Sequence, residues 1–132
     1  GPNCGAGEFG MVNYLDKYFE YYASGQFFKN KYKVDGEEIF HKAEKGDKEA
    51  LEMFEELGTH LGNAVKMILY TYDPEVIIVG GSIKDAYPFY KKSLWREIRN
   101  YAYPKSLERF QIVISTLKNS GVLGAAALCY DQ

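Results

Sequence analysis

The run Val76–Val79, with sequence VIIV, is the feature that most narrows the folds open to this chain. Consecutive β-branched apolar residues are typical of a strand buried on both faces, as a parallel strand is when helices cover it. The run follows Asp73-Pro74, which ends the preceding helix, and it stops at Gly80-Gly81. A second run, Phe110–Thr116, also predicts a strand. Because helical sequence separates the two runs, they are expected to pair in parallel within an α/β fold.

The longest predicted helix precedes the first strand. It begins at Asp47, whose side chain can cap the first turn, and it ends before Asp73. Apolar residues recur in it every three or four positions and predict one buried face, formed by Leu51, Phe54, Leu61, Val65, Ile68 and Tyr72. Gly58 and Gly62 lie one turn apart, and each costs about 1 kcal/mol of helix propensity relative to alanine. Their presence predicts that another element packs closely against this helix.

The other predicted elements are shorter. Helices are expected over residues 17–23, with Gly25 as a left-handed cap, and over 26–32, 37–45 (closed by Gly46), 88–101 and 121–130, with a strand fragment near 9–13. The helix over 88–101 is expected to turn Phe89, Leu94, Trp95 and Ile98 inward. Parallel sheets normally contain several strands with both faces covered. Two strands make an incomplete sheet, so the chain is expected to be a piece of a larger α/β domain.

Composition excludes several classes of protein. The chain has 132 residues, with 16 Lys plus Arg against 18 Asp plus Glu, and this balance lacks the basic excess of nucleic-acid binders. Its two cysteines, Cys4 and Cys129, are too few for a disulfide framework and favour a cytoplasmic protein with reduced thiols. The apolar runs are far shorter than the roughly 20 residues that cross a membrane. No signal peptide pattern is present, and we expect neither membrane nor direct nucleic-acid contact by this chain.

The glycine pair Gly80-Gly81 and two glutamates are candidate binding residues. Gly80 and Gly81 follow a buried strand and precede a helix, where ligands bind in open α/β sheets and where backbone amides can contact phosphate. The alternative is a plain turn that needs positive φ, and the third glycine of a dinucleotide fingerprint is missing. Glu8, in a glycine-rich loop, can accept paired hydrogen bonds from sugar hydroxyls or can be a solvated charge. Glu20, on a short helix, is unremarkable by itself.

Metal chemistry has little support in the sequence. The histidines His41 and His60 and the two cysteines match no zinc-ligand spacing, and the chain has no Cys-x-x-Cys pair. Both histidines fall in predicted helices. We therefore expect them at the surface or at an interface.

Four segments together resemble the ROK family of repressors, open reading frames and sugar kinases. Ala6–Met11 (AGEFGM) is similar to the family's AGE-aliphatic-GH motif, and Phe19–Gly25 (FEYYASG) to its leucine-glutamate-x-Tyr-Ala-Ser-Gly segment. Asp73–Ser82 (DPEVIIVGGS) resembles its DPEVIVLGGG strand, and Gly121–Leu128 (GVLGAAAL) its closing GLLGAAAL helix. The four occur in the family's order and span nearly the whole chain.

The resemblance implies an actin-like, RNase H-like fold of two lobes that hold ATP and sugar between them. Residues 1–132 would be the C-terminal lobe, and the catalytic aspartate would belong to an upstream lobe, so no catalytic residue is expected within this chain. By the same resemblance, Glu8 and Glu20 would accept hydrogen bonds from sugar hydroxyls. Gly80 and Gly81 would border the nucleotide, which is ATP with Mg²⁺ in the intact protein.

The chain departs from the family pattern at its zinc site. Met11 stands at the position of the zinc-binding histidine, the cysteine cluster is missing, and Tyr18 stands where the last cysteine would be. Methionine is a poor zinc ligand, so we expect no structural zinc. Tyrosines and a leucine are then expected to hold the segment 12–18 in place.

Three functions remain open from the sequence. The first is the sugar- and nucleotide-binding lobe of an ATP-dependent sugar kinase, inactive as an isolated chain because the catalytic aspartate lies elsewhere. The second is the sugar-sensing domain of a transcriptional regulator without kinase activity. The third is a dimerisation surface built on the aromatic stretch 87–103 and the glycine-bearing helix. In each case we expect a second copy or a partner to cover the open sheet edge.

Overall fold

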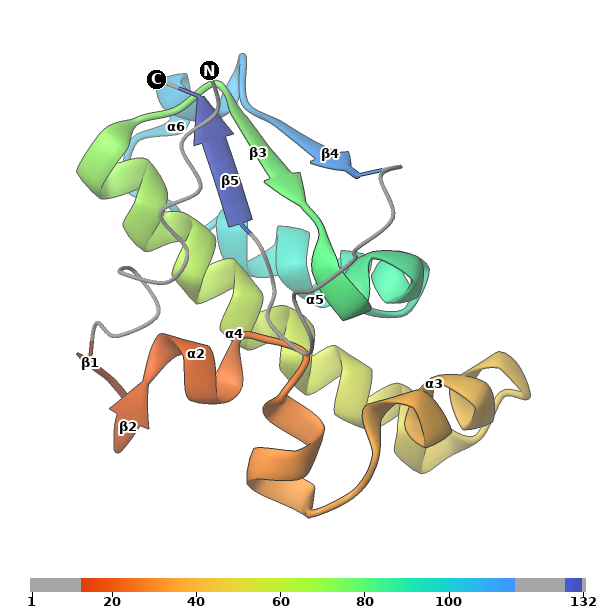
Figure 1. The fold of residues 1–132 in the computed structure, drawn as a ribbon. Coiled ribbons are helices and arrows are strands. Elements are labelled where there is room, and N and C mark those ends of the chain that lie inside the picture. Colours follow the sequence, from red (N-terminus) through yellow and green to blue (C-terminus); the bar gives the residue numbers. More distant parts are fainter. Residues whose placement is uncertain (1–12, 116–127, 132) are drawn as a thin grey trace.

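The computed structural model describes residues 13–115 and 128–131. Its elements are, in chain order, β1 (Asn13–Tyr14), β2 (Lys17–Tyr18), α2 (Phe19–Tyr22), η1 (Phe28–Tyr32), α3 (Gly36–Glu44), α4 (Lys48–Tyr72), β3 (Val76–Val79), η2 (Gly81–Ala86), α5 (Tyr87–Ile98), α6 (Pro104–Leu107), β4 (Gln111–Ile114) and β5 (Leu128–Asp131). η1 is a short π-helix and η2 a 3₁₀-helix. Figure 1 shows α4 crossing the whole molecule, with the sheet near one end and α2, η1 and α3 near the other.

The main sheet has three strands in the order β4-β3-β5. β3 and β4 pair in parallel, with Val76 opposite Gln111 and Val79 opposite Ile114, which confirms the predicted parallel pair. β5 pairs antiparallel on the other edge of β3. The predicted helix over 121–130 is therefore wrong at residues 128–130, because their backbone groups pair with the open edge of β3. Residues 121–127 lie outside the described residues.

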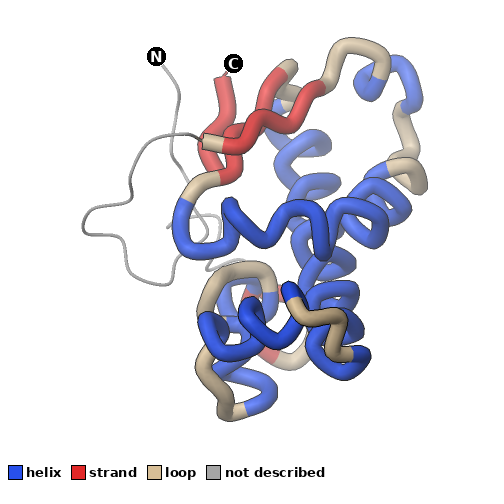
Figure 2. Tube along the Cα trace, turned by 90° about the vertical axis from the view of Figure 1, so that its right-hand side faces the viewer, coloured by secondary structure: helices blue, strands red, loops and turns tan. Residues whose placement is uncertain are grey.

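One face of the sheet packs on α4 and α5, which lie behind it in Figure 1 and beside it in Figure 2. On β3, Ile77 and Val79 are buried, whereas Val76 and Ile78 are half-buried. On β4, Val113 is 44% exposed. The expected burial of the strands on both faces is therefore wrong for the described residues, which cover one face well and the other only in part.

α4 begins and ends as its sequence predicts. The Asp47 side chain accepts a hydrogen bond from the Ala50 N–H at 3.2 Å, and Asp73, at φ 47°, ends the helix. The predicted face is buried at Phe54, Leu61, Val65 and Ile68. Leu51 and Tyr72 are exposed instead, because Ala50 and Leu69 take the buried positions near the two helix ends.

α5 packs closely on α4 at the two glycines. A Cβ atom on Gly58 would lie 2.5 Å from the carbonyl oxygen of Tyr90, and one on Gly62 would lie 2.9 Å from that of Leu94. The backbone of α5 therefore rests directly on α4, as the glycine pair predicts. Leu94 and Ile98 are buried in the core, and Phe89 and Trp95 pack against the same core.

The first described segment differs from the prediction. β1 and β2 form a separate antiparallel ribbon, with Leu15 at φ 53° in the turn, so the helix expected over 17–23 begins only at Phe19. Of the strand fragment expected near 9–13, only Asn13 is described, and it belongs to this ribbon rather than to the main sheet. Gly25 does not adopt the left-handed conformation, whereas Gly46 does, at φ 83°. Among the residues described, no helix is both long enough and apolar enough to cross a membrane.

Candidate functional site

A cavity of about 500 Å³ opens where η1, α3 and η2 meet. Phe28, Phe40 and Phe54 contribute aromatic surface to it, and Lys29 and Asp85 contribute charge. Concave sites of about 300–1,000 Å³ with mostly apolar walls and a few polar groups are the usual form of small-molecule sites. The cavity is therefore the candidate ligand site among the described residues.

The glycine turn after β3 leads into the cavity wall. Gly80 has an extended backbone, and Gly81, at φ 80°, is the first residue of η2. Ile83, Asp85 and Ala86 of η2 then line the cavity. The positive φ at Gly81 confirms that the turn needs a glycine, since an L side chain is strained there. The turn also brings the carboxyl end of β3 next to a ligand-sized cavity.

The segment that carries Glu20 leads to the same cavity from a different part of the chain. Glu20 is the second residue of α2 and is half-buried, and its carbonyl oxygen accepts a hydrogen bond from the Ser24 hydroxyl at 2.6 Å. The Gln26 N–H donates to that hydroxyl oxygen at 3.1 Å. Gly25 and Gln26 line the cavity, so the segment that carries Glu20 continues directly into its wall. Glu8 lies outside the described residues.

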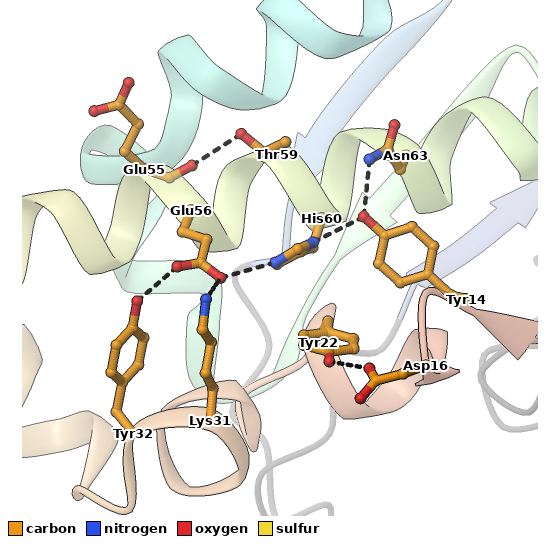
Figure 3. A network of polar contacts seen from close by, with 10 residues as sticks. All are labelled: Tyr14, Asp16, Tyr22, Lys31, Tyr32, Glu55, Glu56, Thr59, His60 and Asn63. Atoms are coloured by element: carbon orange, nitrogen blue, oxygen red, sulfur yellow. Dashed lines mark hydrogen bonds and ion pairs between the residues drawn. The ribbon is translucent and has the colours of Figure 1, made fainter.

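Beside α2, a chain of hydrogen bonds crosses from β1 to α4 (Figure 3). The Asn63 side-chain amide donates to the Tyr14 hydroxyl oxygen at 2.8 Å. The single Tyr14 proton is then donated to His60 Nδ1 at 2.7 Å, and His60 Nε2 donates to Glu56 at 3.1 Å. The ionised Glu56 carboxylate can only accept, so Nε2 carries a proton, and the lowered pKa of His60 favours the neutral ring, in which Nδ1 accepts from Tyr14.

Glu56 ends this chain and receives two further donors. The Tyr32 hydroxyl donates to Glu56 Oε1 at 2.6 Å, and the Lys31 ammonium pairs with Oε2. Burial raises the pKa of Glu56, but hydrogen bonds from Lys31, Tyr32 and His60 outweigh it and hold the pKa below its ordinary value. We call the set Asn63, Tyr14, His60, Glu56, Tyr32 and Lys31 the His60 network.

His60 is buried, with 7% of its surface exposed, so of the two places expected for it, the surface or an interface, the surface is wrong. The rings of Tyr22 and Phe27 lie 4.9 and 5.6 Å from it between ring centres, and this burial lowers the pKa of His60 below its ordinary value of 6.5. His41, on α3, has 59% of its side chain exposed, as predicted.

Sequence reasoning missed the network. The signal was present, since Glu56, His60 and Asn63 are spaced four and three residues apart and so share one face of α4. The expectation that tyrosines hold the segment 12–18 is confirmed at Tyr14, which also stacks on Phe19 at 4.3 Å between ring centres. Leu15 is 67% exposed, so the same expectation is wrong for the leucine.

The described part of this segment does not fit a zinc ion. Tyr14 stacks on Phe19 and bonds His60, and the Tyr18 ring packs on Tyr21 at 6.2 Å between ring centres. Zinc in structural sites takes thiolate, imidazole or carboxylate ligands, and phenol rings supply none of these. Among the described residues, no group of three or more His, Cys, Asp or Glu side chains could hold a metal ion.

Residues 2–132 match the ROK family along essentially the whole chain, and the chain belongs to this family. A glucokinase of Thermotoga maritima is 27% identical over 146 residues, covering 100% of this chain and 46% of that protein. A xylose repressor of Bacillus spizizenii is 28% identical over 139 residues, covering 100% of this chain and 34% of that protein. The chain thus spans less than half the length of these relatives.

A solved structure confirms the fold. The glucokinase of Streptomyces griseus in complex with glucose and AMPPNP superposes with a TM-score of 0.65, at 20% identity over 81% of this chain and 45% of that one. The architecture is therefore a partial RNase H-like, actin-like lobe in which helices flank a parallel strand pair. Relatives of both kinds, sugar kinases and sugar-responsive repressors, share this family.

Proposed function

We propose that residues 1–132 form the sugar- and nucleotide-binding C-terminal lobe of a ROK-type sugar kinase. In the intact protein, ATP with Mg²⁺ would transfer a phosphoryl group to a hexose hydroxyl, with the catalytic aspartate supplied by an upstream lobe. One observation carries the proposal. A single cavity is lined both by the residues that follow Glu20 and by those that follow Gly80-Gly81, so a sugar segment and a nucleotide segment reach one site.

On the sugar side, Glu8 and Glu20 supply carboxylates. An ionised carboxylate accepts short, charge-assisted hydrogen bonds from hydroxyls, and vicinal sugar hydroxyls can use both of its oxygens. The hydrogen bond from Ser24 to the Glu20 carbonyl oxygen fixes the backbone at this position, so the carboxylate projects from a defined point of the fold.

On the nucleotide side, the cavity offers room and aromatic surface for a nucleoside. Its acidic groups, Asp35, Glu37 and Asp85, suit the donors of a base or ribose better than phosphate, whose negative charge they would repel. The phosphates would instead lie against the backbone of Gly80 and Gly81, where no side chain prevents close approach.

A second candidate function is a sugar sensor without kinase activity, because the Bacillus spizizenii xylose repressor also aligns with the entire chain. In that case the same carboxylates would bind sugar, and contact with DNA would be made by residues outside this chain. A purely associative role is the third candidate, for which Tyr70 and Tyr103, 69% and 55% exposed and stacked at 6.4 Å between ring centres, offer an aromatic surface. Under every candidate we propose a cytoplasmic protein that self-associates.

Coupled ADP release from the full-length protein, measured across a panel of hexoses, tests the proposal. We expect ADP release that depends on one hexose and on Mg²⁺. Silence with every hexose, together with a rise in melting temperature on adding one of them, would instead establish the sensor. Silence with no thermal response would contradict both sugar-dependent functions.

Gly81→Ala separates the nucleotide role of the glycine turn from its backbone role. We expect the variant to raise KM for ATP about tenfold in the same assay, because Gly81 has φ 80°, where a side chain strains the backbone, and because a Cβ would oppose close approach of phosphate. Sugar affinity should change little. The matched control is Gly46→Ala, which strains a backbone at nearly the same φ, 83°, but lies in the turn between α3 and α4 rather than in the turn after β3. An equal effect of both variants on KM for ATP would contradict the nucleotide role.

A further inference from the structure

The segment that carries Glu20 is attached to α4 through the His60 network. Phe19 and Tyr22 bound α2, on either side of Glu20. Phe19 stacks on Tyr14 at 4.3 Å between ring centres, and Tyr22 lies 4.9 Å from the His60 ring and 5.8 Å from the Tyr14 ring. Both ends of α2 therefore rest on the two central residues of the network. α2 has only four residues, too few to hold its own position without such contacts.

The network also joins three separate parts of the chain. Tyr14 belongs to β1, whereas His60, Glu56 and Asn63 belong to α4, and Lys31 and Tyr32 belong to η1. Asp16, in the turn between β1 and β2, accepts a hydrogen bond from the Tyr22 hydroxyl and ties the ribbon to α2. Figure 3 shows α2 and the ribbon on one side of the network and α4 on the other. The side chains of these segments are thus connected to α4 by hydrogen bonds and ring contacts.

We propose that the His60 network is a metal-free anchor that positions Glu20 for the sugar, with Tyr14 and His60 as positioning residues. This inference rests on the proposed function, in which Glu20 accepts hydrogen bonds from sugar hydroxyls. The family resemblance implies zinc near this segment, and the described residues do not fit it. In this chain, hydrogen bonds and stacked rings hold α2 against α4.

The direction of the chain makes the anchor sensitive to the charge of His60. Protonation would place a hydrogen on Nδ1, facing the Tyr14 hydroxyl, which then has no acceptor for its own proton because Asn63 is also a donor to it. The titratable and charged groups around His60 are Glu56 on its own helix, Lys31 and Tyr32 of η1, Tyr14 of β1, and Tyr22 of α2 with its partner Asp16. Lys31 also opposes a positive charge on His60.

Sugar affinity of the full-length protein, measured by calorimetry without nucleotide or Mg²⁺, tests the proposal. Tyr14→Phe keeps the stacked ring and removes only the hydroxyl. We expect it to weaken sugar binding roughly 3- to 30-fold, the usual range for a residue that acts through others. The matched control is Tyr70→Phe, which removes a hydroxyl from an exposed ring on α4 outside the cavity lining and should leave sugar affinity unchanged.

Two further readouts distinguish positioning from mere stabilisation. Between pH 7.5 and 5, sugar affinity of the unaltered protein should fall more steeply than that of His60→Gln, which has no imidazole to protonate. A chelator should leave sugar affinity unchanged. If Tyr14→Phe lowers the melting temperature but not sugar affinity, or if chelation weakens binding and zinc restores it, the proposal is overturned. If the unaltered protein binds no hexose of the panel, this proposal fails together with the proposed function.

Discussion

Replacing Gly58 with alanine is expected to lower the free energy of unfolding by about 2 kcal/mol. The added methyl group would lie 2.5 Å from the Tyr90 carbonyl oxygen, and closer still to the Ser93 hydroxyl, so α5 must move away from α4. Such overpacking costs about 3 kcal/mol, of which alanine returns about 1 kcal/mol through its better helix propensity. Chemical denaturation followed by circular dichroism measures the difference.

Two controls identify the cause of this loss. Glu52→Ala, on the exposed face of the same helix, should change the free energy of unfolding by no more than about 0.5 kcal/mol. Ser93→Ala in the Gly58→Ala background removes the hydroxyl, which donates to the Tyr90 carbonyl oxygen at 3.1 Å, but leaves that carbonyl in place. The double variant should therefore recover only part of the lost stability. Full recovery would show that the contact with the α5 backbone is unimportant.

The elements that sequence predicts well are those whose causes are local. α4 carries its own cap at Asp47, a buried stripe of apolar residues and a helix-ending Asp73-Pro74, all within one stretch of chain. The β-branched run of β3 likewise predicts a strand. The helical sequence between β3 and β4 is enough to predict that the two strands pair in parallel. The contact between α4 and α5 is also predictable. Gly58 and Gly62 lower the helix propensity of α4, and close packing of another element is what offsets this cost.

The elements that sequence mispredicts depend on distant partners. Leu128–Asp131 follow a helix-like sequence, yet they form β5 because the edge of β3, about fifty residues earlier, offers unpaired backbone groups. Lys17 and Tyr18 likewise pair with β1 rather than joining α2. Short segments have weak local preferences, so pairing elsewhere in the fold decides their structure.

In the candidate site too, some features are set by the local sequence and others by distant parts of the chain. Gly80-Gly81 and Glu20 were identifiable as residues, but the cavity that both segments reach is made by η1, α3 and η2 together and has no signature in any one of them. His60 is the sharpest example, because Tyr14, its partner at 2.7 Å, is 46 residues away in sequence. Whether a helical histidine is buried or exposed depends on such partners.

Glu20→Ala is expected to weaken sugar binding about 100-fold, because it removes two hydrogen bonds to a charged acceptor. Glu20→Gln keeps one oxygen acceptor and loses the charge, so a smaller loss of about tenfold is expected. Glu8→Ala should act in the same direction as Glu20→Ala. Calorimetric titration of the full-length protein with the hexose that supports ADP release measures all three, and Glu52→Gln, an exposed carboxylate on α4, is the matched control.

The same variants separate sugar recognition from association. Glu20 is a half-buried residue of α2, whereas the exposed aromatic pair proposed for association, Tyr70 and Tyr103, belongs to other elements. The oligomeric state measured by sedimentation should therefore not change in Glu20→Ala. A kinase and a sensor would both lose sugar binding, and only the kinase would also lose ADP release. Unchanged sugar affinity in Glu20→Ala would contradict the proposed sugar site and leave association as the better account of this lobe. Loss of affinity with normal melting in the absence of sugar would mean that the carboxylate acts on the ligand rather than on the fold.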